Sequence, residues 1–254
     1  MNSPDNQNDA ARLSKEYDSW HQKIFETWEG QDQSNPWHLL VLQYLTSVKG
    51  KRVLEVACGS TNFATILQSM GAVVSSVDFS AAALRIAQRK ALSAGAGIST
   101  LDLVQADAHH LPFVDCAFDI VVSCETIEHL LDPLAAVREM ARVCNPDGVL
   151  YLTTPNYLNL MGAYLVYDAI LRRNRCSGGT QPLDHHWLFP RVRSIVKRSG
   201  WNILKSDGTV HQVPFPGRNP VRFSLPERNS VIRRLTSPFA LHYFIFAKKQ
   251  IARD

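Results

Sequence analysis

The sequence predicts an α/β fold in which a mostly parallel β-sheet is flanked by helices. A strand, a turn, a helix and a second strand follow one another between Val53 and Asp78. The same rhythm continues to Thr153 with further short Val- and Ile-rich runs. The first turn consists of small residues, which let a ligand approach the backbone at the carboxyl end of a strand. These observations predict a parallel sheet with a cofactor at its strand ends.

The core elements are expected in this order: a strand from Val53, a helix over Asn62–Met70, strands over Ala72–Val77, Leu103–Ala108 and Ala117–Cys124, a helix over Leu134–Val143 and a strand over Val149–Thr153. Ser80 is expected to cap a helix that begins at Ala81. Pro133 fits the first position of a helix because its missing N–H has no helical partner there. The core is therefore predicted to alternate strands and helices throughout.

Helical spacing over Arg12–Trp28 and Pro36–Leu45 predicts two helices that lie over the cofactor. Beyond the core we expect a helix over Pro190–Ser199, a strand over Trp201–Thr209, an irregular Pro- and Arg-rich stretch over Gln212–Pro238 and a strand over Ala240–Ala247. We predict one domain over 1–254, with an amino-terminal helical cap (1–48), a cofactor-binding core (50–156), a helical insertion or lid (157–188) and the rest of the fold (189–254).

Composition favours a cytoplasmic protein. The first residues are polar and lack the apolar run of a signal peptide, and no apolar stretch is long enough to span a membrane. Five cysteines without CxxC spacing are typical of reduced thiols. Residues 1–156 carry 11 Lys and Arg against 18 Asp and Glu, whereas residues 157–254 carry 16 against 5. The basic half is either a solvated face or a surface for an anionic partner.

The motif from Glu55 to Thr61 resembles motif I of the class I S-adenosylmethionine (SAM) methyltransferases, although Ala57 and Thr61 stand where that family has glycine. The resemblance covers roughly residues 50–156. It implies a three-layer Rossmann-like fold with a seven-stranded sheet whose last strand is antiparallel and lies beside the sixth. It also implies that SAM is the cofactor.

Carried over by motif, the cofactor-binding residues are Glu55, Ala57, Gly59 and Ser60 for methionine and ribose, Asp78 for the ribose hydroxyls, Phe79, Asp107 and Ala108 for adenine, and Cys124 beneath the sulfonium. Tyr17 is read either as a core aromatic or as a contact to the SAM carboxylate. Asp78 is the central prediction, because a carboxylate can accept both hydroxyls of a ribose.

The segment after the fourth strand carries the residues predicted to be catalytic: Glu125, Glu128 and His129. A histidine has a pKa suited to a general base at neutral pH. The same segment resembles both the demethylubiquinone O-methyltransferases and the small-RNA 2′-O-methyltransferases. That resemblance implies a site for Mg²⁺, Mn²⁺ or Zn²⁺ formed by Glu125, Glu128, His129 and His185. Metal-bound, metal-free and purely structural interpretations of this segment stay open.

The sequence thus predicts SAM-dependent methylation of a hydrophobic or anionic small molecule, most simply at a hydroxyl. N-methylation of a small molecule, RNA 2′-O-methylation and SAM binding without catalysis are the alternatives, although no RNA-binding module is recognisable. The apolar stretch Leu158–Leu171, which is followed by three arginines, is expected to form a lid. Its alternative is a peripheral membrane contact through residues 158–175.

Overall fold

The computed structural model describes residues 4–27, 35–60, 63–93, 101–160, 162–163, 181–215, 218–223, 231 and 235–250. The main sheet consists of β1 (Arg52–Val56), β2 (Val73–Asp78), β3 (Asp102–Gln105), β4 (Phe118–Cys124), β5 (Cys144–Pro155), β6 (Trp201–Thr209) and β9 (His242–Lys249). The helices are α1 (Pro4–Thr27), α2 (Pro36–Tyr44), α3 (Phe63–Ser69), α4 (Ala81–Ser93), α5 (Pro133–Val143) and α7 (Phe189–Arg198), with short 3₁₀ helices η1 (Ile127–His129) and η2 (Ser237–Phe239).

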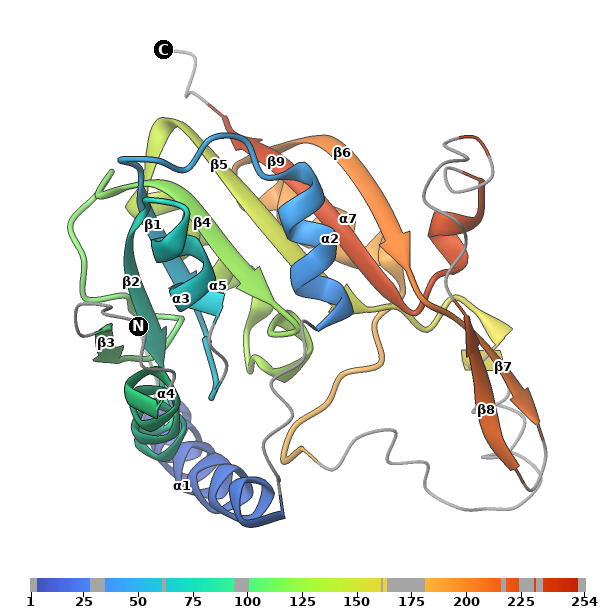
Figure 1. The fold of residues 1–254 in the computed structure, drawn as a ribbon, viewed down its shortest axis with the longest axis horizontal. Helices are drawn as coiled ribbons and strands as arrows, with labels where there is room; N and C mark the ends of the chain where they lie inside the picture. Colours follow the sequence, from blue (N-terminus) through green and yellow to red (C-terminus); the bar gives the residue numbers. More distant parts are fainter. Residues whose placement is uncertain are drawn as a thin grey trace.

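The seven strands form one sheet in the order β3-β2-β1-β4-β5-β9-β6 (Figure 1). The first five strands in this order pair in parallel, whereas β9 pairs antiparallel with both β5 and β6. This arrangement confirms the predicted seven-stranded, mostly parallel sheet and the place of its antiparallel last strand.

Both faces of the sheet are buried because alternate residues of each strand enter two separate cores. In β4, Val121 belongs to the core that contains Met140 of α5 and Val192 of α7. Its neighbour Val122 belongs to the core that contains Leu40 of α2. The near-continuous apolar sequence of the strands follows from this burial on two sides. The layers are therefore α5 and α7, the sheet, and then α2 and α3 (Figure 1).

Helix α1 lies beside α4 at the β3 end of the sheet (Figure 1). Asp18 of α1 accepts hydrogen bonds from the Ser80 hydroxyl at 2.7 Å and from the Ala82 amide at 2.9 Å. The Ser80 hydroxyl in turn accepts a bond from the amide of Ala83 at 3.1 Å, as expected for a helix cap. The amino-terminal helix is thus fastened to the start of α4, directly after the second strand.

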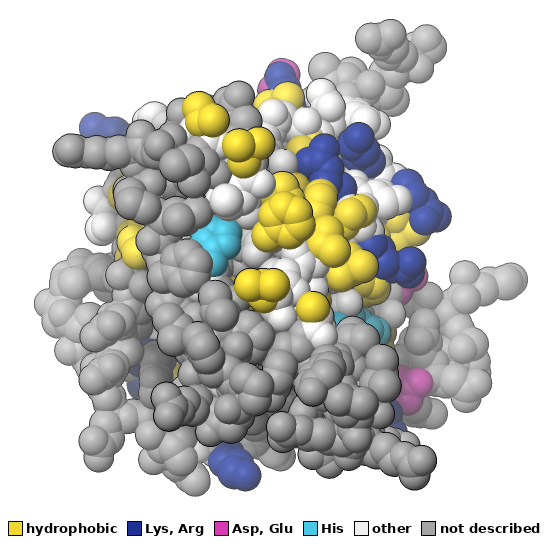
Figure 2. Space-filling view, turned by 90° about the vertical axis from the view of Figure 1, so that its right-hand side faces the viewer, with side chains coloured by type: hydrophobic (Ala, Val, Ile, Leu, Met, Phe, Trp, Pro, Cys, Tyr) yellow, Lys and Arg dark blue, Asp and Glu magenta, His cyan; other side chains and the backbone are white. Residues whose placement is uncertain are grey.

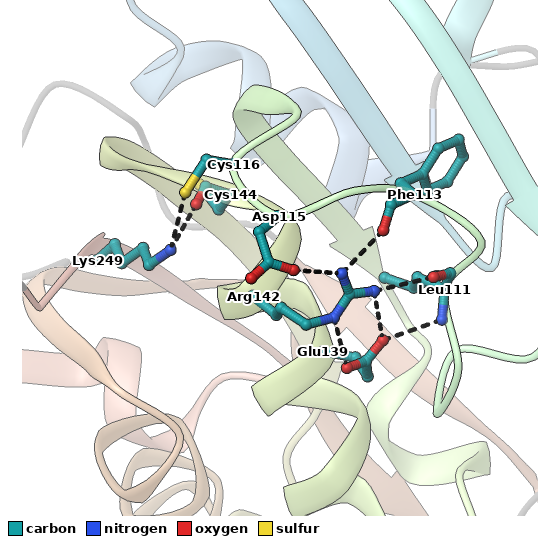
Figure 3. Close-up of polar contacts among 8 residues, drawn as sticks. All are labelled: Leu111, Phe113, Asp115, Cys116, Glu139, Arg142, Cys144 and Lys249. Atoms are coloured by element: carbon teal, nitrogen blue, oxygen red, sulfur yellow. Dashed lines mark hydrogen bonds and ion pairs between the residues drawn. The ribbon is translucent and has the colours of Figure 1, made fainter.

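Arg142 holds the segment that joins β3 to β4 against α5 (Figure 3). Its guanidinium donates to the carboxylates of Glu139 and Asp115, each at 2.8 Å, and to the carbonyl oxygens of Phe113 and Leu111. The hydrogen bonds from Arg142 are the main reason why the pKa of Glu139 is lowered. Because this segment follows Asp107 directly in the chain, the network fixes the loop that begins at the cavity described below.

One sequence expectation was wrong. The stretch Gln212–Pro238 is not irregular throughout, since it contains most of an antiparallel hairpin, β7 (His211–Phe215) and β8 (Arg218–Phe223), and also η2. Other expectations stay predictions. Most of the predicted lid lies outside the described residues, and the boundaries of the four parts of the domain are untested. Within the described residues, no helix has the length and apolar character to cross a membrane.

Candidate active site

A cavity of about 340 Å³ opens at the carboxyl ends of the parallel strands. Residues of α1 and α2 also line it, as expected for the two amino-terminal helices. All nine residues predicted to bind the cofactor line this cavity: Glu55, Ala57, Gly59, Ser60, Asp78, Phe79, Asp107, Ala108 and Cys124. The structure therefore gathers these residues at one place, while their contacts with a cofactor stay predictions.

The turn after β1 is tied to the end of β2 through Asp78. One carboxylate oxygen of Asp78 accepts the amide of Gly59 at 2.8 Å, and the other accepts the amide of Ser80 at 2.8 Å. Gly59 has φ of +57°, and Ala57 has φ of +55°, a left-handed conformation that is unusual for a residue with a Cβ. Ala57 thus adopts the backbone conformation of a glycine turn although it carries a Cβ.

Burial sets the protonation of the two carboxyl groups that flank this turn. It raises the pKa of Asp78 to about 6, and hydrogen bonds from the backbone amides oppose the shift. Burial also raises the pKa of Glu55 to about 8, although Glu55 accepts a hydrogen bond from the Ser76 hydroxyl at 2.9 Å. Asp78 is therefore mostly ionised at pH 7, whereas Glu55 is mostly protonated.

Asp107 is oriented by His109, a residue for which the sequence gave no expectation. The Asp107 carboxylate accepts from the His109 amide at 2.9 Å and from Nδ1 of the ring at 2.5 Å, while Nε2 accepts from the Asp132 amide at 3.1 Å. Burial acts to raise the pKa of Asp107, but the hydrogen bonds from His109 outweigh it and the pKa is lowered. Asp107 is thus held as a carboxylate at the cavity edge.

Aromatic residues also line the cavity. The ring of Tyr17 lies 5.2 Å from that of Phe79, and its hydroxyl donates to the carbonyl of Leu183 at 3.1 Å. His21 and His38 also line the cavity, and burial lowers the pKa of each to about 4. Both rings are therefore neutral at pH 7. Tyr17 is buried and also lines the cavity, so both of its interpretations stay open.

Glu125 is the first residue after β4 and has φ of +50°, a second strained backbone position at the cavity. Its amide donates to the carbonyl oxygen of Thr153 at 3.0 Å. One carboxylate oxygen lies 2.8 Å from Nδ1 of His242, which belongs to β9. Sequence reasoning missed His242, because only the antiparallel insertion of β9 beside β5 brings it to this point.

His129 and Glu128 lie on η1, and each makes a hydrogen bond to a residue of another segment. Nδ1 of His129 lies 2.5 Å from the carbonyl oxygen of Leu183, the same oxygen that accepts from Tyr17. A carbonyl oxygen only accepts, so Nδ1 carries the proton and Nε2 of the neutral ring is free to accept. Glu128 is 1% exposed and accepts from the Thr154 hydroxyl at 3.0 Å. Burial, then repulsion from Glu125, raises the pKa of Glu128 well above its usual value.

The four side chains predicted to bind a metal do not converge as a coordination site. Over the described residues, which include all four, no three His, Cys, Asp or Glu side chains surround a common point. The ring nitrogen of His129 faces Leu183, one oxygen of Glu125 faces His242, and the ring of His185 lies against Trp187 with the centroids 5.1 Å apart. The metal set inferred from resemblance does not fit the structure.

The predicted membrane-surface contact through 158–175 stays a prediction, because residues 164–175 lie outside the described part. Figure 2 shows that hydrophobic side chains lie beside Lys and Arg on the side of the molecule that carries β7 and β8. Large hydrophobic residues with exposed side chains include Leu160, Leu235 and Phe239.

Comparison with known proteins places this site in a family. Residues 54–152 match the family described as a methyltransferase domain. Residues 54–152 are therefore a methyltransferase domain. The ubiquinone biosynthesis O-methyltransferase of Haemophilus ducreyi is 28% identical to this chain over 151 residues, which is 56% of this chain and 64% of that protein. The protein of the same name from Albidiferax ferrireducens is 33% identical over 148 residues, 55% of this chain and 58% of that one.

The chain thus spans roughly three fifths of the length of these two relatives. Among solved structures, a SAM-dependent methyltransferase from Mesorhizobium loti superposes with a TM-score of 0.60 at 18% identity, and the match covers 87% of this chain and 100% of that one. At this identity the likeness shows a shared fold. The fold and the family of the core are therefore those that motif I implied.

Proposed function

We propose that this methyltransferase transfers the methyl group of SAM to a hydroxyl of a small molecule, with His129 as the general base. The observation that carries the proposal is the cavity, because the nine predicted cofactor residues and His129 all line it. The names of the relatives support O-methylation. In this proposal SAM supplies an electrophilic methyl group, and the residues of the chain bind, orient and deprotonate.

The cavity residues fit the chemistry of SAM. Each oxygen of the Asp78 carboxylate accepts one backbone amide, which leaves lone pairs for the two ribose hydroxyls. The turn is open at Gly59, where an added Cβ would come no closer than 3.8 Å to His21. Burial raises the pKa of the Cys124 thiol, so that this side chain adds no charge beneath the reacting centre. In this proposal the methionine, ribose and adenine groups of SAM all bind in this one cavity.

His129 has the properties of a base. Burial is the main reason why its pKa is lowered, so the ring is neutral at pH 7. With Nδ1 donating to Leu183, the lone pair of Nε2 is the proton acceptor. A phenolic hydroxyl has a pKa of ~10 and is mostly protonated at pH 7, so removal of its proton strengthens the nucleophile. We assign no step to a divalent cation, because the predicted ligands do not converge.

The proposal is tested in two stages on the full chain. Calorimetry first measures binding of SAM and of S-adenosylhomocysteine, and mass spectrometry then follows methyl transfer to a panel of phenols, amines and short RNAs. The variant His129→Asn should lose about 10²–10⁴ in kcat while SAM affinity is unchanged. If kcat in this variant equals that of the parent, His129 is not the base.

The same two stages separate the alternatives. Methylated amines in place of ethers would identify N-methylation, and salt-sensitive retention of RNA with methylation of it would identify RNA 2′-O-methylation. Saturable SAM binding without any methylated product would identify a SAM-binding protein that does not catalyse transfer. Absence of SAM binding by the folded protein would refute the proposal and all of these alternatives.

A further inference from the structure

His109 lines the cavity between Asp107, which is predicted to bind adenine, and the segment that carries His129. Leu130 and Leu131 of that segment line the cavity together with His109. The side chain of His109 is 14% exposed, whereas that of its neighbour His110 is 65% exposed. Of these two adjacent histidines, His109 is therefore the one that is placed to act on the cavity.

The partners of the His109 ring fix the nitrogen that carries its proton. Nε2 lies 3.1 Å from the backbone nitrogen of Asp132, and a backbone N–H can only donate. Nε2 therefore holds a lone pair, and the proton of the neutral ring is on Nδ1. Nδ1 lies 2.5 Å from Oδ1 of Asp107 and donates to it. The hydrogen bonds thus run in one direction, from Asp132 through His109 to Asp107.

His109 directs the Asp107 carboxylate through a single oxygen. The backbone amide and Nδ1 of His109 both donate to Oδ1, at 2.9 and 2.5 Å. The other oxygen, Oδ2, lies 4.0 Å from Nδ1 of His110, which is beyond hydrogen-bond distance. Because Oδ1 is held twice, the carboxylate cannot turn about its Cβ–Cγ bond without losing a hydrogen bond. Oδ2 therefore keeps one direction at the cavity wall that Asp107 lines.

The residue that fixes the His109 ring is itself fixed by a helix. Asp132 is the N-cap of α5, and its side chain accepts the amides of Leu134 and Ala135, each at 3.0 Å. Supports that lie on regular elements hold a site more precisely than loops do. The start of α5 thus determines, through one imidazole ring, the direction of the Asp107 carboxylate.

A carboxylate with a fixed direction can distinguish purine bases. It accepts hydrogen bonds and so can pair with the exocyclic amine of adenine. A 6-oxopurine has a carbonyl oxygen at that place, and two acceptors that face each other leave both without a donor. A carboxylate that was free to turn would accept the N1–H of the 6-oxo base instead. Burial acts to raise the pKa of Asp107, but the hydrogen bonds from His109 outweigh it and lower the pKa, so Asp107 has no proton to donate.

We infer that His109 is a positioning residue that makes the cofactor site prefer a 6-aminopurine to a 6-oxopurine, because it holds Asp107 in the direction that meets the exocyclic amine. The inference rests on the proposed function, since it concerns how the cavity selects its cofactor. His109 acts through Asp107 rather than by contact with the base, and no step of methyl transfer is assigned to it.

The test compares S-adenosylhomocysteine with its 6-oxo analogue, S-inosylhomocysteine. Calorimetry on the full chain measures both affinities, and their ratio reports the base alone because the rest of the ligand is the same. We expect the parent to prefer the adenosyl ligand about 10- to 100-fold, the range that one hydrogen bond to a charged group gives. Equal affinities overturn the inference alone. Failure of both ligands to bind refutes the proposed function and the inference with it.

Replacement of His109 separates positioning from a general structural role. His109→Leu removes both hydrogen bonds of the ring and should bring the two affinities to within about threefold of each other. His109→Ala is measured beside it, so that a failure of one variant to fold leaves the other to decide. His109→Asn keeps an N–H donor near the place of Nδ1 and should retain part of the preference. If both affinities fall together and their ratio is unchanged, the role of His109 is structural and the inference is wrong.

The route through Asp107 is tested with a double variant. In Asp107→Asn the side-chain amide can both donate and accept, so it pairs with either base and the preference should fall as in His109→Leu. Addition of His109→Leu to Asp107→Asn should then leave the ratio unchanged. A further fall would show that His109 contacts the base directly and would overturn the inference. His110→Leu is the matched control, and an equal loss of preference there would also overturn it.

Nitrogen NMR of the histidine rings gives a readout that needs no variant for its outcome. Protonated and unprotonated ring nitrogens have clearly different resonance frequencies, so the spectrum identifies the tautomer. His109 in the parent, with S-adenosylhomocysteine bound, should carry its proton on Nδ1. A proton on Nε2 would show that the ring does not donate to Asp107 and would overturn the inference.

Discussion

Oε2 of Glu125 lies 2.8 Å from Nδ1 of His242, although 117 positions separate the two residues in the chain. His242 begins β9, and its ring lies 5.0 Å from that of Trp37, which lines the cavity. The residue that follows β4 at the candidate active site is therefore positioned by the last strand of the sheet.

Replacement of His242 by leucine should release Glu125 without touching the cofactor subsites. We expect His242→Leu to destabilise the fold by about 1–3 kcal/mol, because a largely buried carboxylate loses its donor. His242→Asn keeps an N–H donor and should recover part of that loss. Urea unfolding of the two variants measures the difference, and equal stability of both would show that the contact contributes nothing.

Asp78 should control the affinity for SAM. In Asp78→Asn one charged acceptor becomes an amide, and a hydrogen bond to a charged group contributes roughly 1.5–3 kcal/mol. We therefore expect SAM affinity to fall about 10- to 100-fold, as measured by calorimetry. The exposed Asp147→Asn variant is the control for charge. Unchanged SAM affinity in Asp78→Asn would show that Asp78 does not bind the ribose hydroxyls.

Ala57 has the backbone conformation that glycine adopts without strain. A left-handed residue with a Cβ costs about 1–2 kcal/mol, and the extra freedom of glycine in the unfolded chain offsets roughly half of that gain. Ala57→Gly should therefore be as stable as the parent or up to about 1 kcal/mol more stable. The same change at Ala91 inside α4 should lose about 1 kcal/mol. Thermal unfolding measures the stability of both variants. A loss of stability in both would contradict the inference that the backbone of Ala57 is strained.

Glu55 should make stability depend on pH. Its pKa is raised to about 8 from a usual value of 4.5, so the folded protein binds more protons than the unfolded chain between these values. The contribution of Glu55 to the free energy of unfolding is thus present below pH 4.5 and is lost as pH rises to 8. Glu55→Gln should be stabilised relative to the parent by roughly 1–3 kcal/mol more at pH 8 than at pH 5. Urea unfolding of both proteins at pH 5 and pH 8 measures this difference. The same difference in stability between variant and parent at both pH values would contradict the prediction.

The sequence was sufficient for the core because local signals there agree with the tertiary fold. The sequence from Val53 to Asp78 is typical of a strand, a turn, a helix and a strand. Because the carboxyl ends of parallel strands meet at one edge, the sequence alone indicates which residues gather there. Ser80 was likewise predictable as a cap, since capping depends on residues within one turn of helix.

The parts that escaped prediction depend on contacts distant in sequence or on the backbone. His242 reaches Glu125 only through the insertion of β9, and the acceptor for His129 and Tyr17 is a carbonyl oxygen, which every residue possesses. The β7–β8 hairpin contains Pro214 and Pro220, which argue against a strand within a large sheet but are tolerated where strands have a free edge. The metal set failed because residue types reveal which atoms can coordinate and say nothing of their direction.

The strand order has a consequence for how the molecule is assembled. β9 is made after β6 yet lies between β5 and β6, so β6 has no neighbour to pair with in the main sheet until residues near 249 have left the ribosome. The amino-terminal strands can associate during synthesis, but closure of the sheet, and with it the placement of His242 beside Glu125, must follow translation of β9. In the nascent protein, the part of the cavity around Glu125 should accordingly form late, after the part formed by the ends of β1 and β2.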